Sequence, residues 1–210
     1  MSARGPATSQ RTSVAGPEGA DYGRSRRPAG LSWVTVGNPW LASDAVADVR
    51  IRLAEVADAA AIRTIYNLEV TTATSTFDLV TRSLDDQVAW LEDRSGAFSA
   101  IVAVDADDTV VGFASLSPYK ERAAYRTTVE DSVYVDRERN GQGIGQLLLS
   151  HVVDVARASG FHAVMARIEA SGAASRALHA RCGFELVGIE REVGRKFGRW
   201  LDVAVMQLVL

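Results

Sequence analysis

Cysteine is nearly absent from this chain: Cys182 is the only one among 210 residues. A single thiol cannot form an intrachain disulfide, so nothing in the sequence calls for an oxidising compartment. Long apolar runs are missing as well. The longest, residues 146–156, is interrupted by Ser150, His151 and Asp154 and falls well short of the ~20 apolar residues that cross a bilayer. We therefore expect a cytoplasmic protein that has no membrane partner.

A strong excess of either charge is also missing. The formal net charge is -3 and 23% of the residues are charged, which gives no electrostatic reason to expect a nucleic-acid partner. The histidines, the cysteine and the acidic residues show no metal-ligand spacing. The sequence therefore predicts neither a nucleic-acid-binding protein nor a metalloprotein.

Proline is scarce after the first 47 residues. Residues 1–47 hold four of the five prolines, set among Gly, Ser, Thr and Ala: Pro6, Pro17, Pro28 and Pro39. Such a composition buries too little apolar surface to offset the entropy lost on ordering. We expect residues 1–47 to be a disordered extension and residues 48–210 to form one folded domain.

From position 49 onward, the hydrophobic periodicity alternates between strand and helix type, which predicts a mixed α/β domain. Strands are expected at 49–53, 98–104, 109–116, 127–136, 161–168, 184–190 and 200–209. Helices are expected after Asp58 as a cap, at 83–93, from Ile144 onward, and at 173–181 before Gly183. The first of these helices is predicted to bury Ala61, Ile62, Ile65 and Leu68, and the third Ile144, Leu148, Val152 and Val155.

Three glycines at alternate positions, Gly141, Gly143 and Gly145, lie between an expected strand and an expected helix. Free backbone N–H groups and the helix dipole make such a junction an anion site, and glycine lets the backbone approach phosphate oxygens. The dinucleotide pattern G-x-G-x-x-G fails because Gln146 stands where its last glycine belongs, and no Gly-Lys-Ser/Thr follows as in a P-loop. A turn that only allows close packing is the alternative, and the alternating glycines favour phosphate binding.

The residues before this loop make the motif more specific. Ser132-Val133-Tyr134-Val135 followed by x-x-G-x-G resembles the acetyl-CoA motif of the GNAT acetyltransferase superfamily. Segments 118–130 and 196–202 further resemble the branch that acetylates phosphinothricin and methionine sulfoximine. The resemblance implies the GNAT acyl-CoA N-acyltransferase fold, an α/β (α+β) domain with a mixed, mostly antiparallel sheet of about six to seven strands flanked by about four helices.

Acetyl-CoA is the co-substrate that the resemblance implies. Its pyrophosphate would meet the backbone amides of Gly141, Gln142, Gly143, Ile144, Gly145 and Gln146. The other implied coenzyme contacts are Val133, Tyr134, Val135, Gly172 and Ser175.

Two positions depart from the motif. The first residue of the loop motif is usually Gln or Arg and is Asn140 here, so we expect Arg137 or Arg139 to compensate. Gly172 stands where the branch commonly has an asparagine that contacts pantetheine. Both departures shift coenzyme binding toward backbone amides.

Amide formation needs a neutral amine, yet an α-amino group with a pKa of ~8 is mostly protonated at pH 7. The resemblance places Glu130 at the catalytic glutamate position of the branch, as the base, and His179 at a helix position that assists departure of the thiolate. Chemistry alone does not decide which is base and which is acid. A solvent-facing strand residue and a structural histidine are the alternatives. Helical spacing puts Ser175 and His179 on one face, beside a core stripe of Ala174, Leu178 and Cys182.

The acceptor side is predicted from basic and aromatic residues. An arginine fork suits a carboxylate or a phosphinate, so we expect a small amino-acid-like substrate that is acetylated on its α-amino group. The predicted substrate-binding residues are Phe77, Lys120, Arg122, Tyr125, Glu130, Ser132 and Lys196. The alternatives are another amine, such as a protein N-terminus, a polyamine or an aminoglycoside, and a non-catalytic acyl-CoA sensor. The resembling branch is typically dimeric, so a homodimer is expected.

Overall fold

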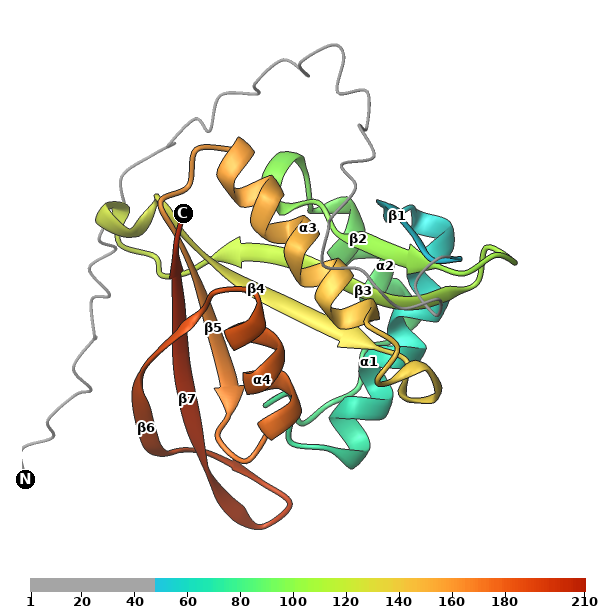
Figure 1. The fold of residues 1–210 in the computed structure, drawn as a ribbon. Helices are drawn as coiled ribbons and strands as arrows, with labels where there is room; N and C mark the ends of the chain where they lie inside the picture. Colours follow the sequence, from blue (N-terminus) through green and yellow to red (C-terminus); the bar gives the residue numbers. More distant parts are fainter. Residues whose placement is uncertain (1–47) are drawn as a thin grey trace, which may run out of the picture. The chain divides into compact units, whose positions relative to one another are not determined.

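The computed structural model describes residues 48–210, and the expectation of a disordered extension at 1–47 lies outside the described residues. Seven strands form one sheet in the order β1-β2-β3-β4-β5-β7-β6 (Figure 1). They are β1 (Arg50–Leu53), β2 (Ile101–Val104), β3 (Val110–Pro118), β4 (Thr128–Val135), β5 (Ala163–Glu169), β6 (Glu185–Lys196) and β7 (Arg199–Val209). The α-helices are α1 (Ala59–Thr72), α2 (Leu84–Glu92), α3 (Ile144–Ala158) and α4 (Ala173–Arg181). The predicted mixed, mostly antiparallel sheet with helices around it is confirmed.

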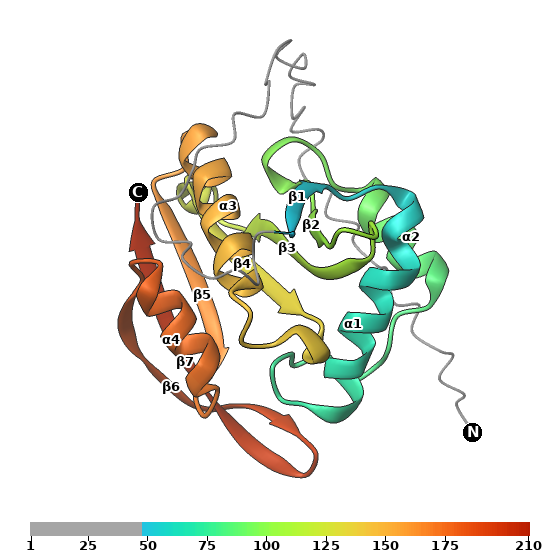
Figure 2. The ribbon, with the colours of Figure 1, turned by 45° about the vertical axis from the view of Figure 1, so that its right-hand side comes forward.

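The helices cover both faces of the sheet, with α1 and α2 on one side and α3 and α4 on the other (Figure 1 and Figure 2). Strand β2 shows how the sequence divides its side chains between them. Ile101 and Ala103 belong to the core cluster around α3, whereas Val102 and Val104 belong to the cluster under α1 and α2. Neighbouring side chains on a strand point to opposite faces, so a continuous apolar run serves two cores.

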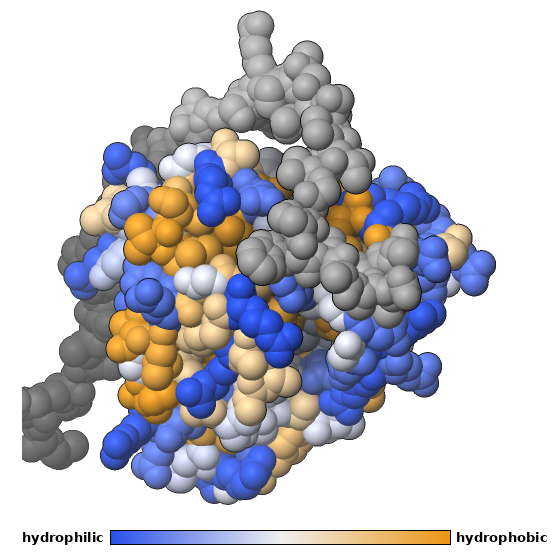
Figure 3. Space-filling view, viewed as in Figure 1, coloured by the Kyte–Doolittle hydropathy of each residue, from blue (hydrophilic) through white to orange (hydrophobic). Residues whose placement is uncertain are grey.

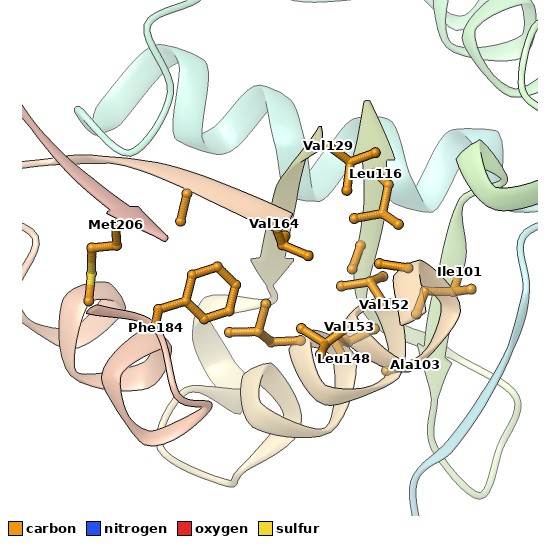
Figure 4. Packing of buried hydrophobic residues seen from close by; sticks show 14 of the residues in the cluster. Ile101, Ala103, Leu116, Val129, Leu148, Val152, Val153, Val164, Phe184 and Met206 are labelled. Carbon is orange, nitrogen blue, oxygen red and sulfur yellow. The ribbon is translucent and has the colours of Figure 1, made fainter. Parts of the chain in front are cut away.

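Helix α3 packs its apolar face onto the middle of the sheet, as predicted. Ile144, Leu148 and Val152 are buried, and Val155 packs against the rim of the same cluster. Figure 4 shows Leu148 and Val152 among side chains from three adjacent strands: Leu116, Val129 and Val164. This packing fixes the start of α3, and with it the glycine loop, relative to β4.

The sheet opens between β4 and β5, which form its one parallel pair among the described strands. Only three residue pairs join them: Thr128 with Ala163, Val129 with Val164, and Glu130 with Met165. Beyond Glu130 the strands part, although β4 continues to Val135 and β5 to Glu169 (Figure 2). The facing edges of the two strands are therefore free of partners over this length, and such an edge offers unpaired N–H and C=O groups.

Three local expectations are wrong. Leu68 of α1 is 42% exposed, because the buried face of α1 continues from Ile62 through Tyr66 and Val70 at helical spacing. Asp58 precedes α1 but does not cap it with its side chain, since that carboxylate binds Arg52 at 2.7 and 2.8 Å.

The third correction concerns α4. Leu178 and Cys182 pack against the core as expected, but Ala174 is exposed and His179 is the buried residue of the helix. A polar side chain in this position needs partners inside the protein.

Within residues 48–210, no helix is long and apolar enough to cross a bilayer.

Candidate active site

The loop between β4 and α3 places two glycines in the left-handed region of backbone conformation. The φ angle is +77° at Gly141 and +85° at Gly143, and glycine is favoured there because it has no Cβ. No side chain caps α3 at Gly143. The N–H of Leu147 donates to the C=O of Gly143 at 3.1 Å, so the N–H groups between them have no partner within the helix. The loop has the free donors that an anion site needs.

The third glycine of the loop has a different physical reason. A Cβ built on Gly145 would lie 3.2 Å from Leu178 Cδ2, so the absence of a side chain lets α3 approach α4. At Gly141, by contrast, an added Cβ would meet no protein atom within 4 Å. Close packing thus explains Gly145, while backbone conformation explains the other two glycines.

The arginines expected to compensate for Asn140 are bound elsewhere. Arg137 donates from Nε to Glu69 Oε1 at 2.6 Å and from a terminal nitrogen to Thr72 Oγ1 at 2.8 Å, both at the end of α1. Arg139 donates to Asp105 Oδ2 at 2.8 Å. Both guanidinium groups thus hold the loop to neighbouring elements.

Along β4, the residues before the loop offer a ligand their backbone rather than their side chains. Val133 and Val135 pack against the core cluster around α3, and the Tyr134 ring stacks on Phe113 with centroids 5.2 Å apart. All three lie beyond the last pair with β5, which ends at Glu130. Their predicted contact with a coenzyme is therefore open to their main chain.

Glu130 lies at the point where β4 and β5 part, and it is half-buried. Burial raises the pKa of its carboxyl group, Arg167 lowers it, and the charges of Asp131 and Glu190 raise it further, with a net rise. Arg167 is itself paired with Glu190 at 2.7 Å. Ser132 follows two residues later on the same face of the strand. The strand thus presents a carboxylate with raised basicity at the apex of the opening.

His179 is buried in α4, with both ring nitrogens occupied by acceptors of the protein. Nε2 lies 3.1 Å from Asp131 Oδ2, and Nδ1 lies 2.8 Å from the backbone oxygen of Ser175. The Oγ of Ser175 is also near, at 3.5 Å from Nδ1, so the predicted shared face of these two residues is confirmed. The ring contacts Phe184 edge-on at 5.1 Å between centroids.

Gly172 directly precedes α4, and its neighbourhood explains the missing side chain. An added Cβ would lie 3.0 Å from the backbone oxygen of Glu169 and 3.4 Å from Ile168 Cγ2. The Gly172 N–H donates to that same Glu169 oxygen at 2.8 Å. A larger residue would have to shift this tight turn, so the position contributes backbone only.

The predicted acceptor residues fall into two groups in the structure. Lys120, Arg122 and Tyr125 are exposed and line one open hollow on the loop between β3 and β4. The Lys120 ammonium lies 5.2 Å from the centre of the Tyr125 ring. This loop starts beside Glu130, because Glu130 pairs with Ser117 near the end of β3.

Phe77 and Lys196 form the second group, where the β6 and β7 hairpin meets the loop after α1. Lys196 is 3% exposed, and its Nζ donates to the backbone oxygens of Thr76 at 2.7 Å and Glu69 at 3.4 Å. Burial lowers the pKa of this ammonium, partly offset by Asp78 and Glu69. In the described structure, the Lys196 ammonium thus fixes the segment that carries Phe77.

Gly194 makes room for the Phe77 ring, which gives a test of its role. A Cβ on Gly194 would overlap Phe77 Cε2, so Gly194→Ala must displace the ring. We expect the KM for the acceptor to rise about tenfold, equivalent to ~1.4 kcal/mol, with little change in the KM for acetyl-CoA. Gly188→Ala is the matched control in the same strand, since a Cβ there meets nothing within 4 Å. Equal acceptor KM values for the two variants would exclude Phe77 as an acceptor wall.

Sequence reasoning missed the charges that surround Glu130. Arg167 and Glu190 come from β5 and β6, and Asp131 adjoins Glu130 on β4. Only Asp131 left a signal, as a second acidic residue inside an apolar strand. The described residues contain no group of three or more His, Cys, Asp or Glu side chains that could hold a metal ion.

Comparison with known proteins gives one consistent result. The sequence profile of the acetyltransferase (GNAT) domain matches residues 51–205. An L-methionine sulfoximine/L-methionine sulfone acetyltransferase from Pseudomonas aeruginosa is 42% identical over 161 residues, which cover 76% of this chain and 94% of that protein. A phosphinothricin N-acetyltransferase from Streptomyces coelicolor is 39% identical over 161 residues, covering 75% and 94% of the two chains.

A solved structure agrees with these relatives. The GNAT superfamily phosphinothricin acetyltransferase from Sinorhizobium meliloti, in complex with AcCoA, superposes with a TM-score of 0.74 at 37% identity. The match covers 78% of this chain and 89% of that one. Sequence and fold thus point to the same group of proteins.

Proposed function

Since the chain belongs to the GNAT acetyltransferase family and so is an acetyl-CoA-dependent N-acetyltransferase, we propose that it acetylates the α-amino group of a small amino-acid analogue. Methionine sulfoximine, methionine sulfone and phosphinothricin are the analogues that the names of its relatives indicate. The observation that carries the proposal is the position of Glu130, a half-buried carboxylate where β4 and β5 part. A base in such an opening can meet an amine beside the coenzyme.

The coenzyme side is proposed to bind through main-chain groups. The amides of 141–146 would hold the pyrophosphate at the start of α3, where the helix dipole favours an anion. The free edge of β4 at Val133–Val135 offers N–H and C=O groups to the amides of the pantetheine arm. Acetyl-CoA supplies a thioester carbonyl that an amine can attack. The residues present therefore fit this co-substrate.

We assign the role of base to Glu130. Its carboxylate accepts a proton from the substrate ammonium, directly or through water, so that the nitrogen lone pair can form the new bond to the acetyl carbon. As the carbon–sulfur bond breaks, the sulfur leaves with the electron pair and takes up the second proton that the nitrogen loses, directly or through water. Burial raises the pKa of Glu130 and so brings its basicity closer to the operating pH. A carboxylate in this environment is a better base than one on the surface.

We assign an electrostatic role to His179 in the departure of the thiolate. A ring that donates from both nitrogens carries a positive charge, and such a charge favours an anion that forms nearby. In the described structure, both ring nitrogens of His179 face acceptors, Asp131 Oδ2 and the backbone oxygen of Ser175. The proposal therefore does not require His179 to release a proton.

Lys120 and Arg122 are proposed to select an acceptor that carries an anionic group. Both side chains are exposed in the hollow beside the start of β4, where a guanidinium can bind a carboxylate or a phosphinate with two hydrogen bonds. A polycationic acceptor would be repelled there. The hollow therefore favours amino-acid analogues over polyamines and aminoglycosides.

An assay of thiol release tests the acceptor. Purified protein with acetyl-CoA is expected to release thiol with methionine sulfoximine, methionine sulfone or phosphinothricin, and not with spermidine, an aminoglycoside or a peptide with a free N-terminus. Release with the polycations alone would contradict the argument from Lys120 and Arg122. Binding of acetyl-CoA without release from any acceptor would instead identify a sensor.

We also propose that the protein is a homodimer. The edge strand β6 exposes apolar side chains: Leu186, Val187, Ile189 and Val193. Figure 3 shows apolar residues gathered at the lower left of the view, the side where Figure 1 draws β6. An exposed apolar edge strand favours pairing with a second copy. Sedimentation equilibrium is expected to give about twice the 22.5 kDa of one chain, whereas a single-chain mass at micromolar concentration would contradict the proposal.

The cellular location that we propose is the cytoplasm. The enzyme needs acetyl-CoA as co-substrate, so it must lie where that coenzyme is available. Fractionation of cells that express the protein would test this, and recovery outside the cytoplasmic fraction would contradict it.

A further inference from the structure

Asp131 and His179 form a buried pair across the opening of the sheet. Asp131 lies on β4 and His179 on α4, and the side chains are 2% and 5% exposed. Asp131 Oδ2 lies 3.1 Å from His179 Nε2. The other carboxylate oxygen, Oδ1, is buried and accepts no hydrogen bond from the described residues. His179 is therefore the donor on which this carboxylate depends.

The contacts of the ring decide its protonation. The backbone oxygen of Ser175 has no hydrogen to donate, so Nδ1 must carry the proton of their 2.8 Å contact. A carboxylate at Asp131 is likewise only an acceptor, and opposite it Nε2 carries a proton as well. Burial lowers the pKa of His179, but the hydrogen bond and charge of Asp131 and the Ser175 carbonyl raise it by more. The geometry and the raised pKa both favour a charged imidazolium.

The pair lies one residue from the proposed base. Glu130 and Asp131 adjoin on β4 and point to opposite faces of the strand. The charges around Glu130 are Asp131, Arg167 of β5 and Glu190 of β6. The charge that acts on His179 is Asp131, and the Ser175 carbonyl is its other acceptor. Cys182, which directly follows this helix, also lies within the field of Asp131. The imidazolium neutralises Asp131, which otherwise would be a bare charge beside the base.

We propose that Asp131 is a positioning residue of the acetyl transfer: it keeps His179 doubly protonated and fixes α4 to β4 beside Glu130. This proposal rests on the proposed function, because it takes Glu130 as the base. Asp131 acts through His179 and need not touch a substrate. Nothing in the loop motif assigned it a role, and its partner lies 48 residues away in the chain.

The variant Asp131→Asn removes the negative charge of the side chain but keeps its contact with His179. The amide can donate to a neutral Nε2, so the hydrogen bond survives while the carboxylate charge is lost. We expect kcat to fall about 10 to 100-fold, with the KM values for acetyl-CoA and acceptor nearly unchanged. We also expect the basic limb of the kcat profile to move to lower pH, because His179 loses its anionic partner and becomes neutral sooner. A residue that is only structural would lower kcat evenly at every pH.

A spectroscopic readout makes the proposal independent of turnover. With ¹⁵N-labelled histidine, NMR is expected to show His179 of the wild type doubly protonated above pH 6.5, the ordinary histidine pKa, and neutral in Asp131→Asn at the same pH. A neutral His179 in the wild type would overturn the proposal without any variant. Asp154→Asn, which removes an exposed carboxylate on α3, is the matched control and should leave the signal and kcat unchanged.

The double variant distinguishes the possible failures. If Asp131 acts through His179, Asp131→Asn should add little loss of kcat in a His179→Gln background. Independent, additive losses would contradict the proposal. Full activity of Glu130→Gln would instead defeat the assignment of the base, and the NMR result for His179 would stand apart from that outcome.

Discussion

Glu130→Gln is expected to lower kcat for thiol release by about 10² to 10⁴-fold, the range that general base catalysis contributes. The amide keeps the size of the side chain but cannot take a proton from the acceptor amine. Acetyl-CoA binding should be unchanged, because the proposed coenzyme contacts are main-chain groups at 133–135 and 141–146. Steady-state assays at saturating acceptor, together with calorimetric titration of acetyl-CoA, measure both quantities.

The pH dependence of the wild type checks the same assignment. Burial raises the pKa of Glu130, and a base works only when ionised, so kcat should fall with decreasing pH at values above the ordinary glutamate pKa of ~4.3. This fall of kcat at low pH should be absent from the residual activity of Glu130→Gln. Glu185→Gln, a charge removal at an exposed position of β6, serves as the control. Comparable losses in both variants would reject Glu130 as the base.

Gly141→Ala is expected to raise the KM for acetyl-CoA by at least about tenfold, or ~1.4 kcal/mol in binding. The added methyl group would enter space that no protein atom occupies within 4 Å, where we place the pyrophosphate. Alanine at a φ of +77° is also strained by roughly 1 to 2 kcal/mol, so stability and binding must be separated. Isothermal titration of acetyl-CoA and thermal unfolding measure the two.

Gly160 provides the matched control for that strain. Its φ is +78° and a Cβ there also meets nothing within 4 Å, but it follows the far end of α3, whose start carries the proposed cradle. Gly160→Ala should lose similar stability and keep its affinity for acetyl-CoA. If the two variants bound acetyl-CoA equally well, the loop would not be a phosphate cradle.

The order of elements could be predicted from the sequence because it depends on local patterns. Alternating apolar runs gave the strands, and α3 followed from Ile144, Leu148 and Val152 on one helical face. The buried face of α1 was predicted less accurately. Leu68 was expected to be buried, but Tyr66 is buried and Leu68 is exposed. Hydrophobic periodicity does not fix which of two neighbouring faces of a helix is buried. Only tertiary packing decides between them.

The candidate site, too, could be predicted from the sequence only in part. Position in the chain was enough to place Glu130 in the strand that leads to the glycine loop, and the glycines before a helix. It was not enough to pair Arg137 with Glu69 or to bury Lys196 under Thr76, because these contacts join residues 68 and 120 positions apart. The local sequence does not show which of several cationic side chains will bind an acceptor in another element.

The short contact between β4 and β5 has a consequence for assembly of the enzyme. All pairings of β1 to β4 lie before the Gly160 turn, and all those of β5 to β7 lie after it, so three residue pairs are the whole bridge between the two parts of the sheet. Glu130, Asp131 and the glycine loop come from the first part, and His179 comes from the second. With the roles proposed for these residues, the two lengths of chain must associate correctly before acetyl transfer can begin, and we expect catalytic activity to measure that association.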